Sequence, residues 1–293
     1  MDSILQREKE GSIAIVTGAG RGIGRAIALS LADVGFCVVL VARSLAEVES
    51  TATGILSGGG KGMAISVDVA DWLSVQAMLQ RTTDTFGRID VLVNNAGIQG
   101  EIGPFVENDV QKWNHTIQVN LLGTVNCTRA ALPSMMSQGQ GKIINLSGGG
   151  ATSPRANFSA YATSKAAIVR LTETLAEEVK PYNIQVNAVA PGAINTYMLE
   201  EVLALGADKV GVAEMAAASY RAQQGGDSLA HVLELVTFLA SDASGTLTGK
   251  LISAVHDPWR DWVGKADELN STPLYTLRRL DPYTIKPLID VIT

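Results

Sequence analysis

The chain has 293 residues, of which 46% are hydrophobic and 18% charged, and its formal net charge at pH 7 is −6. This composition can fill a sizeable buried core and excludes a disordered chain, and the negative balance offers no general basic surface for nucleic acid or an anionic membrane. The first residues, MDSILQREKEG, lack the apolar stretch of a secretory signal, and no apolar run approaches the roughly 20 residues that span a bilayer. We therefore expect a soluble, cytoplasmic protein without nucleic-acid or membrane partners.

The three histidines and two cysteines of the chain are scattered along the sequence. His115, His231 and His256 are far apart in the sequence and show no ligand spacing with cysteines or carboxylates, so no metal site is expected. Cys37 lies in a predicted strand and Cys127 in a predicted helix, where a buried free thiol is the ordinary interpretation.

Segments of strand and helix character alternate from residue 12 to about residue 255. The predicted strands are short and rich in apolar, β-branched residues: 12–17, 36–41, 63–67, 89–94, 142–146, 184–189 and 251–255. Several are apolar throughout, as in a parallel sheet that helices cover on both faces. The helical segments between them begin with cap signals, namely the Ser44 and Glu47 capping box, Asp71 and Asp227. This alternation predicts an α/β fold with one doubly wound parallel sheet of seven strands.

No linker or internal repeat divides this alternation, so residues 11–255 are expected to form a single domain. Within it, the GGGKG stretch at 58–62 is interpreted as a solvent-facing turn between a helix and a strand. Residues from about 195 to 225 are expected to form a mobile lid over the functional site. Residues 256–293 form a C-terminal extension with four prolines and four aromatic side chains. We expect an ordered, irregular arm that crosses toward a neighbouring subunit or covers the site, because exposed aromatic surface is unfavourable.

A glycine-rich loop joins the first predicted strand to the first predicted helix, with the sequence Thr17-Gly18-Ala19-Gly20-Arg21-Gly22-Ile23-Gly24. Gly18 permits a tight turn, Gly22 lets the backbone approach a pyrophosphate, and Gly24 lets the helix lie close to the sheet. The N-terminus of the helix then faces the anion. A glycine cluster alone is also typical of a structural turn, but its place between a strand and a helix favours a nucleotide site. The spacing is T-G-x-x-x-G-x-G, not the more widespread G-x-G-x-x-G.

Further motifs follow in chain order: Asn94-Asn95-Ala96-Gly97 after the fourth strand, Asn120 in a helix, Tyr161-x-x-x-Lys165, and Pro191-Gly192. Together with the glycine-rich loop, this combination resembles the short-chain dehydrogenase/reductase family over residues 12–255. The resemblance implies a Rossmann-type fold, assembly into a homo-oligomer such as a dimer or tetramer, and hydride transfer at a Tyr–Lys centre.

The end of the second strand bears on the choice of dinucleotide. An acidic residue there would bind the adenosine ribose 2′-hydroxyl, but this chain has Ala42 followed by Arg43 and Ser44. Arg43 and Arg21 suit a dianionic 2′-phosphate, because charge-assisted bidentate pairs are strong. In the alternative, both arginines are ordinary solvated surface charges. NADP(H) is therefore the expected cofactor.

The resemblance implies further cofactor contacts along the chain. Asp68 and Val69 resemble the adenine contact, the 94–97 motif lines the adenosine side, and the 191–196 segment covers the nicotinamide. The full set of expected contacts is Gly18, Gly20, Arg21, Gly22, Ile23, Gly24, Arg43, Ser44, Asp68, Val69, Asn95, Ala96, Gly97, Tyr161, Lys165, Pro191, Gly192, Ile194 and Thr196. On local signal alone, the 94–97 motif is also a buried asparagine pair that satisfies loop backbone, and the 191–196 segment is also a strand-ending turn.

Tyr161 and Lys165 are four residues apart in a predicted helix and therefore share a face. A nearby ammonium and the positive nicotinamide favour the phenolate form of a tyrosine whose ordinary pKa is about 10. Tyr161 could then donate a proton to a carbonyl oxygen as hydride arrives, or accept one in the reverse direction. By resemblance, Lys165 also holds the nicotinamide ribose, and Asn120 positions a water that relays protons. Taken alone, the Y-x-x-x-K spacing is usually a chance pair on a helix surface.

One position departs from the family pattern. The family serine that orients the substrate carbonyl lies 13 residues before the tyrosine, where this chain has Gly148. Ser147 precedes it directly, and three consecutive glycines could bend the chain enough to bring Ser147 into the site. We therefore include Ser147 among the expected catalytic residues, with Tyr161, Lys165 and Asn120. In the alternative, Ser147 only caps the strand, and Tyr161 or a loop residue such as Ser153 or Ser159 orients the carbonyl.

The expected function is that of an NADP(H)-dependent oxidoreductase, which transfers a hydride between the nicotinamide and a carbonyl or secondary alcohol. Reductases of 3-oxoacyl, sugar or other ketone substrates are the nearest kinds. The alternative is a catalytically altered dinucleotide-binding protein that acts as a sensor or scaffold, and dehydration or epimerisation is a more distant one. The lid length is compatible with a sugar, an acyl thioester or a polycyclic alcohol. Arg155, Lys209 and Arg221 either face an anionic group there or are solvated surface charges.

Overall fold

Seven parallel strands form a single sheet in the computed structural model, which describes residues 11–279 and residue 281. The strands are β1 (Ile13–Thr17), β2 (Cys37–Ala42), β3 (Lys61–Ser66), β4 (Val91–Asn94), β5 (Gly141–Leu146), β6 (Ile184–Ala190) and β7 (Leu251–Ser253). They lie in the order β3-β2-β1-β4-β5-β6-β7, and every neighbouring pair is parallel. The predicted doubly wound sheet is therefore confirmed. Its strand order reverses between β1 and β4, which is where open α/β sheets form a binding crevice.

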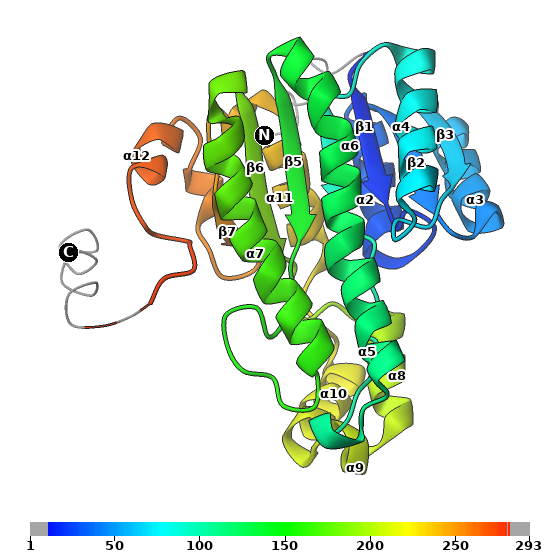
Figure 1. Ribbon diagram of the computed structural model, residues 1–293, viewed down its shortest axis with the longest axis vertical. Coiled ribbons are helices and arrows are strands. Elements are labelled where there is room, and N and C mark those ends of the chain that lie inside the picture. Colours follow the sequence, from blue (N-terminus) through cyan, green and yellow to red (C-terminus); the bar gives the residue numbers. More distant parts are fainter. Residues whose placement is uncertain (1–10, 280, 282–293) are drawn as a thin grey trace.

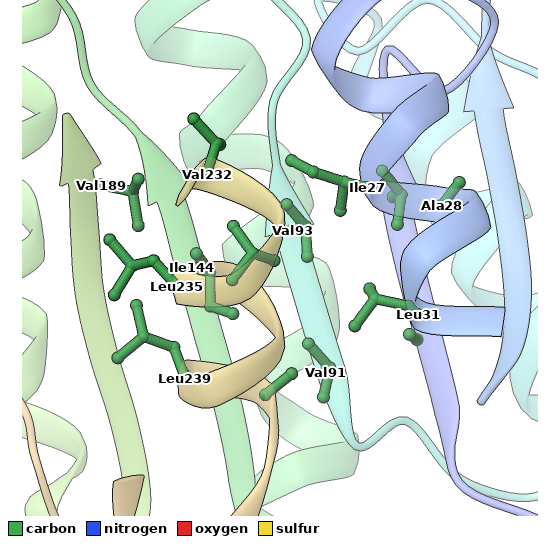
Figure 2. Close-up of a cluster of buried hydrophobic side chains, with 14 of the residues drawn as sticks. Ile27, Ala28, Leu31, Val91, Val93, Ile144, Val189, Val232, Leu235 and Leu239 are labelled. Carbon is green, nitrogen blue, oxygen red and sulfur yellow. The ribbon is translucent and has the colours of Figure 1, made fainter. Parts of the chain in front are cut away.

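Helices cover both faces of this sheet (Figure 1). On one face lie α2 (Gly22–Asp33), α3 (Leu45–Ser57) and α11 (Leu229–Ala240), and on the other lie α4 (Trp72–Phe86), α6 (Gly123–Gln138) and α7 (Ser159–Val179). Every residue of β1 is buried, because both faces of this central strand meet apolar helix surfaces. Figure 2 shows part of the core on the face covered by α2, α3 and α11, in which Ile27 and Leu31 of α2 and Leu235 and Leu239 of α11 pack with side chains of β4, β5 and β6.

A second group of helices lies at the carboxyl ends of the strands (Figure 1). These are α5 (Val110–Ile117), α8 (Tyr197–Leu205), α9 (Ala207–Val210) and α10 (Val212–Gln224). The last three occupy the segment predicted as a lid, and we use that name for them. The shorter elements are η1 (Phe105–Glu107), the π-helical turn η2 (Gln118–Leu122), η3 (Lys180–Tyr182), η4 (Asp242–Ser244), η5 (Trp259–Asp261) and α12 (Ala266–Asn270). None of the described helices is both long and apolar enough to cross a membrane.

Two of the three predicted helix starts are confirmed, and one is wrong. Ser44 accepts a hydrogen bond from a backbone N–H in the first turn of α3, and Asp71 does the same for α4. At α11 the N-cap residue is Ser228, and the preceding Asp227 accepts the Ala193 N–H at 2.6 Å instead. The Asp227 carboxylate therefore fixes the segment after β6, which is a long-range contact that the local sequence does not reveal.

Two smaller predictions are also confirmed. Cys37 and Cys127 are free and buried, in β2 and α6, and burial raises the pKa of the Cys127 thiol to about 12. The glycine-rich stretch at 58–62 joins α3 to β3 and is largely exposed. These features are structural and lie outside the candidate site.

The chain after β7 packs along the outer edge of the sheet (Figure 1). Trp259 is fully buried, and the Trp262 and Tyr275 rings pack with their centres 4.6 Å apart. The Leu251 N–H of β7 donates to the Tyr275 carbonyl oxygen at 2.7 Å, and the buried Lys250 ammonium donates to two further carbonyl oxygens of the arm. Residues 256–279 thus lie against their own chain, so the prediction that the arm covers the functional site is wrong for this part. Contact with a neighbouring subunit stays a prediction, and residues 280 and 282–293 lie outside the described residues.

Candidate active site

A cleft of about 480 Å³ opens at the carboxyl ends of the strands, where the strand order reverses. The glycine-rich loop, the end of β2, the segments after β3 and β4, and the start of α8 form its walls. Most of the expected cofactor contacts line it: Gly18, Gly20, Arg21, Gly22, Ile23, Gly24, Arg43, Ser44, Asp68, Val69, Asn95, Ala96, Gly97 and Thr196. Nucleotides bind at such switch points in open α/β sheets, so the topology brings these scattered residues together where a dinucleotide is expected.

The glycine-rich loop is in close contact with the end of β4. A Cβ atom on Gly24 would lie 2.2 Å from the Gly18 carbonyl oxygen and 2.3 Å from the Asn95 amide nitrogen. No side chain fits at residue 24, so only glycine lets the first turn of α2 approach the strand ends this closely. The N-terminus of α2 therefore lies in the cleft wall. The Asn95 amide donates to the Thr17 carbonyl oxygen at 2.9 Å, and the Asn95 and Ala96 N–H groups donate to the Thr17 hydroxyl. The 94–97 motif therefore holds this loop in place.

Two guanidinium groups border the cleft near the end of β2. Arg43 follows Ala42, the last residue of β2, and both Arg43 and Arg21 are exposed and line the cleft. The Arg21 guanidinium carbon lies 4.7 Å from the centre of the Tyr197 ring at the start of α8. Glu47 of α3 and Tyr197 of α8 also line the cleft, which was not predicted from the sequence. Glu47 showed a capping signal, but its position in the cleft depends on how α3 packs against the loop.

Tyr161 and Lys165 lie on one face of α7, as their spacing predicts. The Lys165 ammonium is 5.6 Å from the centre of the Tyr161 ring and donates to the Leu146 carbonyl oxygen of β5 at 2.7 Å. Both side chains are buried. Burial raises the pKa of Tyr161, and the Arg155 guanidinium acts in the opposite direction. Burial lowers the pKa of Lys165 to about 8. A buried phenol thus lies beside a buried amine whose pKa is close to neutral pH, an arrangement suited to proton transfer.

Asn120 lies in the π-helical turn η2 between α5 and α6, a kind of turn that is frequent at functional sites. Its fully buried side chain accepts the Ile98 N–H at 2.8 Å and donates to the Ile98 carbonyl oxygen at 2.9 Å. It also donates to the Ser164 hydroxyl at 3.1 Å, which in turn donates to the Tyr161 carbonyl oxygen. Asn120 thus connects the segment after β4 to helix α7 beside Tyr161. Ser164 was not predicted, and its place on the face of Tyr161 and Lys165 is the signal that could have identified it.

Ser147 and Gly148 lie in different surroundings. The Ser147 hydroxyl is buried and donates to the Lys165 carbonyl oxygen at 3.5 Å. A Cβ atom on Gly148 would instead lie 2.5 Å from the Tyr161 hydroxyl oxygen. Residue 148, and not residue 147, faces the tyrosine hydroxyl. The expectation that Ser147 is catalytic is therefore wrong, and the geometry assigns this residue a structural role. The reason is that the Ser147 N–H still pairs with the Val189 carbonyl oxygen of β6, and the chain bends only after it.

The two alternative serines are not placed for the role either. Ser153 is exposed, and the Ser159 hydroxyl accepts the Trp113 indole N–H at 3.0 Å. Tyr161 is therefore the candidate for orienting a substrate carbonyl.

Some expected cofactor contacts are not in the cleft wall. Among the described residues these are Pro191, Gly192, Ile194, Tyr161 and Lys165. Ile194 packs against the hydrophobic core, while Thr196, the N-cap residue of α8, does line the cleft. Tyr161 lies under the lid, in an apolar cluster that includes Val202 of α8 and Ala218 of α10. Tyr161 therefore packs in one apolar cluster with the lid and does not itself line the cleft.

The sequence and the fold are similar to those of known proteins. The short chain dehydrogenase family matches residues 12–204. The short-chain reductase protein NovJ of Streptomyces niveus is 40% identical over 242 residues, which are 82% of this chain and 91% of NovJ. An NAD⁺-bound xylitol dehydrogenase has a TM-score of 0.79 at 29% identity, over 84% of this chain and 98% of that one. A variant of the actinorhodin polyketide ketoreductase, solved with NADPH, has a TM-score of 0.76 at 27% identity, over 83% and 95%.

These similarities extend over most of each chain. In this chain the glycine-rich loop and residues 95–97 border the cleft, and Tyr161 and Lys165 lie on α7. The chain therefore belongs to the short-chain dehydrogenase/reductase family, oxidoreductases that bind a nicotinamide dinucleotide and act on carbonyl and alcohol groups.

Proposed function

We propose that the protein is an NADP(H)-dependent oxidoreductase that transfers a hydride between the nicotinamide and a carbonyl or secondary alcohol. The observation that carries this proposal is that Asn120 and Lys165 lie directly behind Gly97 of the cleft wall, with the Tyr161 ring centre 5.6 Å from the Lys165 ammonium. Gly97 lines the cleft, and a Cβ atom there would lie 3.3 Å from the Asn120 amide oxygen and 3.7 Å from the Lys165 ammonium. Groups suited to proton transfer therefore border the cleft that fits the dinucleotide.

The residues present fit a bound NADP(H). The tight contact of Gly18 with Gly24 keeps side chains away from the N-terminus of α2, which is what a pyrophosphate requires. Arg21 and Arg43 suit a 2′-phosphate, and Ala42 stands where a carboxylate would accept a free ribose hydroxyl. One of the two similar structures holds NAD⁺ and the other NADPH, so the choice of NADP(H) rests on these side chains. When bound, the nicotinamide supplies or accepts the hydride.

Tyr161 is the proposed proton donor in reduction and the proton acceptor in oxidation. The Lys165 ammonium favours the phenolate by its charge, and its hydrogen bond to the Leu146 carbonyl oxygen keeps it beside the ring. Asn120 holds the segment at Ile98 against α7, and it stays a candidate for positioning a relay water. The apolar lid side chains around Tyr161 exclude water from the Tyr161 hydroxyl.

Tyr161→Phe tests this proposal, because it removes the transferable proton and keeps the ring. Wild-type protein should consume NADPH, followed by its absorbance, with at least one member of a panel of 3-oxoacyl thioesters, sugars and cyclic ketones. The variant should lose turnover by a factor on the order of 10²–10⁴, while its Kd for NADPH, measured by fluorescence titration, stays the same. Turnover by the variant within a few-fold of wild type would refute the assignment.

Gly148 supports a second candidate function, that of a dinucleotide-binding sensor or scaffold. The position that faces the Tyr161 hydroxyl carries no hydroxyl of its own. A sensor would bind NADPH and consume none of it with any member of the panel, so the same assay separates the two functions.

The homo-oligomer and the cytoplasmic location stay predictions, and sedimentation of the purified protein tests the former.

A further inference from the structure

Arg155 lies in the loop between β5 and α7, directly beside Tyr161. Its guanidinium carbon is 3.7 Å from the centre of the Phe158 ring and 5.9 Å from the centre of the Tyr161 ring. The side chain is only 19% exposed, and a Cβ atom on Gly149 would lie 3.9 Å from one of its nitrogens. The guanidinium is thus held over aromatic rings in partly buried surroundings, where a charge acts over several ångströms.

The lid supplies the partner of this guanidinium. Glu214 of α10 accepts from Arg155 at 2.6 Å (Nη2 to Oε1) and at 3.3 Å (Nε to Oε2). Arg221, in the last turn of α10, lies 3.6 Å from the same Oε1 atom. The three side chains are between 19% and 28% exposed. Two guanidinium groups therefore share one carboxylate, which leaves net positive charge near Tyr161.

The other surroundings of Tyr161 are apolar. Its neighbours from the segment after β4, the loop before α7 and the three lid helices are Ile102, Phe158, Val202, Val210 and Ala218. The Arg155 guanidinium carbon and the Lys165 ammonium, the latter on the same helix, lie 5.9 Å and 5.6 Å from the centre of its ring. Residue 148 offers the phenol no hydroxyl. In such surroundings, positive charge is the main factor that can stabilise a phenolate.

We propose that Arg155 is a positioning residue that makes Tyr161 a stronger acid, and that Glu214 of the lid limits this effect by pairing with Arg155. The inference deepens the proposed function, on which its catalytic consequence rests. Because the carboxylate comes from α10, docking of the lid sets the charge that Tyr161 experiences. The direction of the Arg155 effect agrees with the opposing influences on the pKa of Tyr161, which burial raises and Arg155 lowers.

A purely structural role of the ion pair leads to a different expectation. If the pair only fastens the lid, breaking it from either side exposes Tyr161 in the same way and changes its titration in the same direction. If charge is decisive, removing Arg155 and removing Glu214 shift the titration of Tyr161 in opposite directions. Loss of Arg155 removes positive charge and raises the pKa of Tyr161, whereas loss of Glu214 removes negative charge and lowers it.

Tyrosinate absorbance tests this directly and needs no substrate. The titration of Tyr161 is taken as the difference between each protein and the same protein carrying Tyr161→Phe. We expect Arg155→Gln to move this titration to higher pH and Glu214→Gln to move it to lower pH. Lys209→Met is the matched control, because it removes the lid's exposed ion pair with Glu107 and should leave the titration in place. Shifts in the same direction for the two test variants, or no shift, would overturn the proposal.

Kinetics supply the second readout. In the oxidation direction the phenolate is the active form. Arg155→Gln should therefore lower kcat/KM at neutral pH on the order of tenfold, and the activity of this variant should recover at higher pH. Arg155→Lys keeps the charge and should restore most of the activity and the wild-type pH profile; a Lys variant that matches Gln would contradict the charge role. If the wild-type protein neither reduces a carbonyl nor oxidises an alcohol, the proposed function fails, and the absorbance titration still decides the inference.

Discussion

Replacement of Gly148 by alanine places one methyl group against the atom proposed to transfer the proton. The added Cβ atom would lie 2.5 Å from the Tyr161 hydroxyl oxygen, 3.3 Å from Cζ and 3.4 Å from Cε1. Ordinary van der Waals contact begins at 3.4 Å, so the hydroxyl has to retreat by about 0.9 Å. A misplacement of about 1 Å in a reacting group costs on the order of 10²-fold in rate, which corresponds to about 2.7 kcal/mol. We therefore expect kcat to fall roughly 100-fold.

Gly149→Ala is the matched control for this variant. Its Cβ atom would have 3.9 Å to the nearest atom, an Arg155 nitrogen, so the same change in the same loop meets no obstacle. Steady-state reduction of a carbonyl and the Kd for NADPH should be measured for both variants. Gly148→Ala should lose kcat and keep its Kd, whereas Gly149→Ala should resemble wild type. Gly148→Ser should also lose activity, because it introduces the same Cβ atom.

Stability measurements check the physical cause. The crowding should lower the free energy of unfolding by about 1–3 kcal/mol, and this loss should shrink when Tyr161→Phe removes the closest atom. Wild-type kcat in Gly148→Ala would refute the steric reasoning, as would equal losses in Gly148→Ala and Gly149→Ala. A gain of activity in Gly148→Ser would show that the site has room for the hydroxyl found in the family.

Three further variants test other parts of the structure. Ala42→Asp should reverse the preference for NADPH over NADH, because the carboxylate repels a 2′-phosphate and accepts a free ribose hydroxyl; unchanged Kd values for both would contradict the assignment. Ser147→Ala should cost about 1 kcal/mol of stability and leave kcat unaltered, and a 100-fold loss of kcat would return Ser147 to the active site. Burial lowers the pKa of Lys250 from 10.5 to about 8, so the folded chain binds fewer protons than the unfolded chain between these values. The stability contributed by this residue should then rise with pH over that interval. Denaturant midpoints should show a smaller rise in Lys250→Met than in wild type, because among the described lysines only Lys165 then keeps the same shift.

Local features of the sequence were enough to predict the sheet and the cofactor loop. Strands buried on both faces are apolar at every position, so β1 and β2 are visible as short apolar runs without any knowledge of their neighbours. The place of Gly18–Gly24 between strand and helix, and the four-residue spacing of Tyr161 and Lys165, are likewise properties of adjacent residues. Backbone geometry converts such spacings directly into a turn or a shared helix face.

Contacts between distant segments decided the rest. Asp227 bonds to a residue 34 positions earlier, and Arg155 to one 59 positions later, so neither partner can be identified from nearby residues. Whether residue 147 or residue 148 faces the tyrosine depended on where the pairing of β5 with β6 ends, because successive side chains of a strand point to opposite faces. Local patterns of residues were enough to predict which elements form and most of the catalytic and cofactor-binding groups that lie on them. The tertiary structure determined the side-chain orientations at the bend and the charges around Tyr161, since these depend on packing between elements that the chain brings together only when it folds.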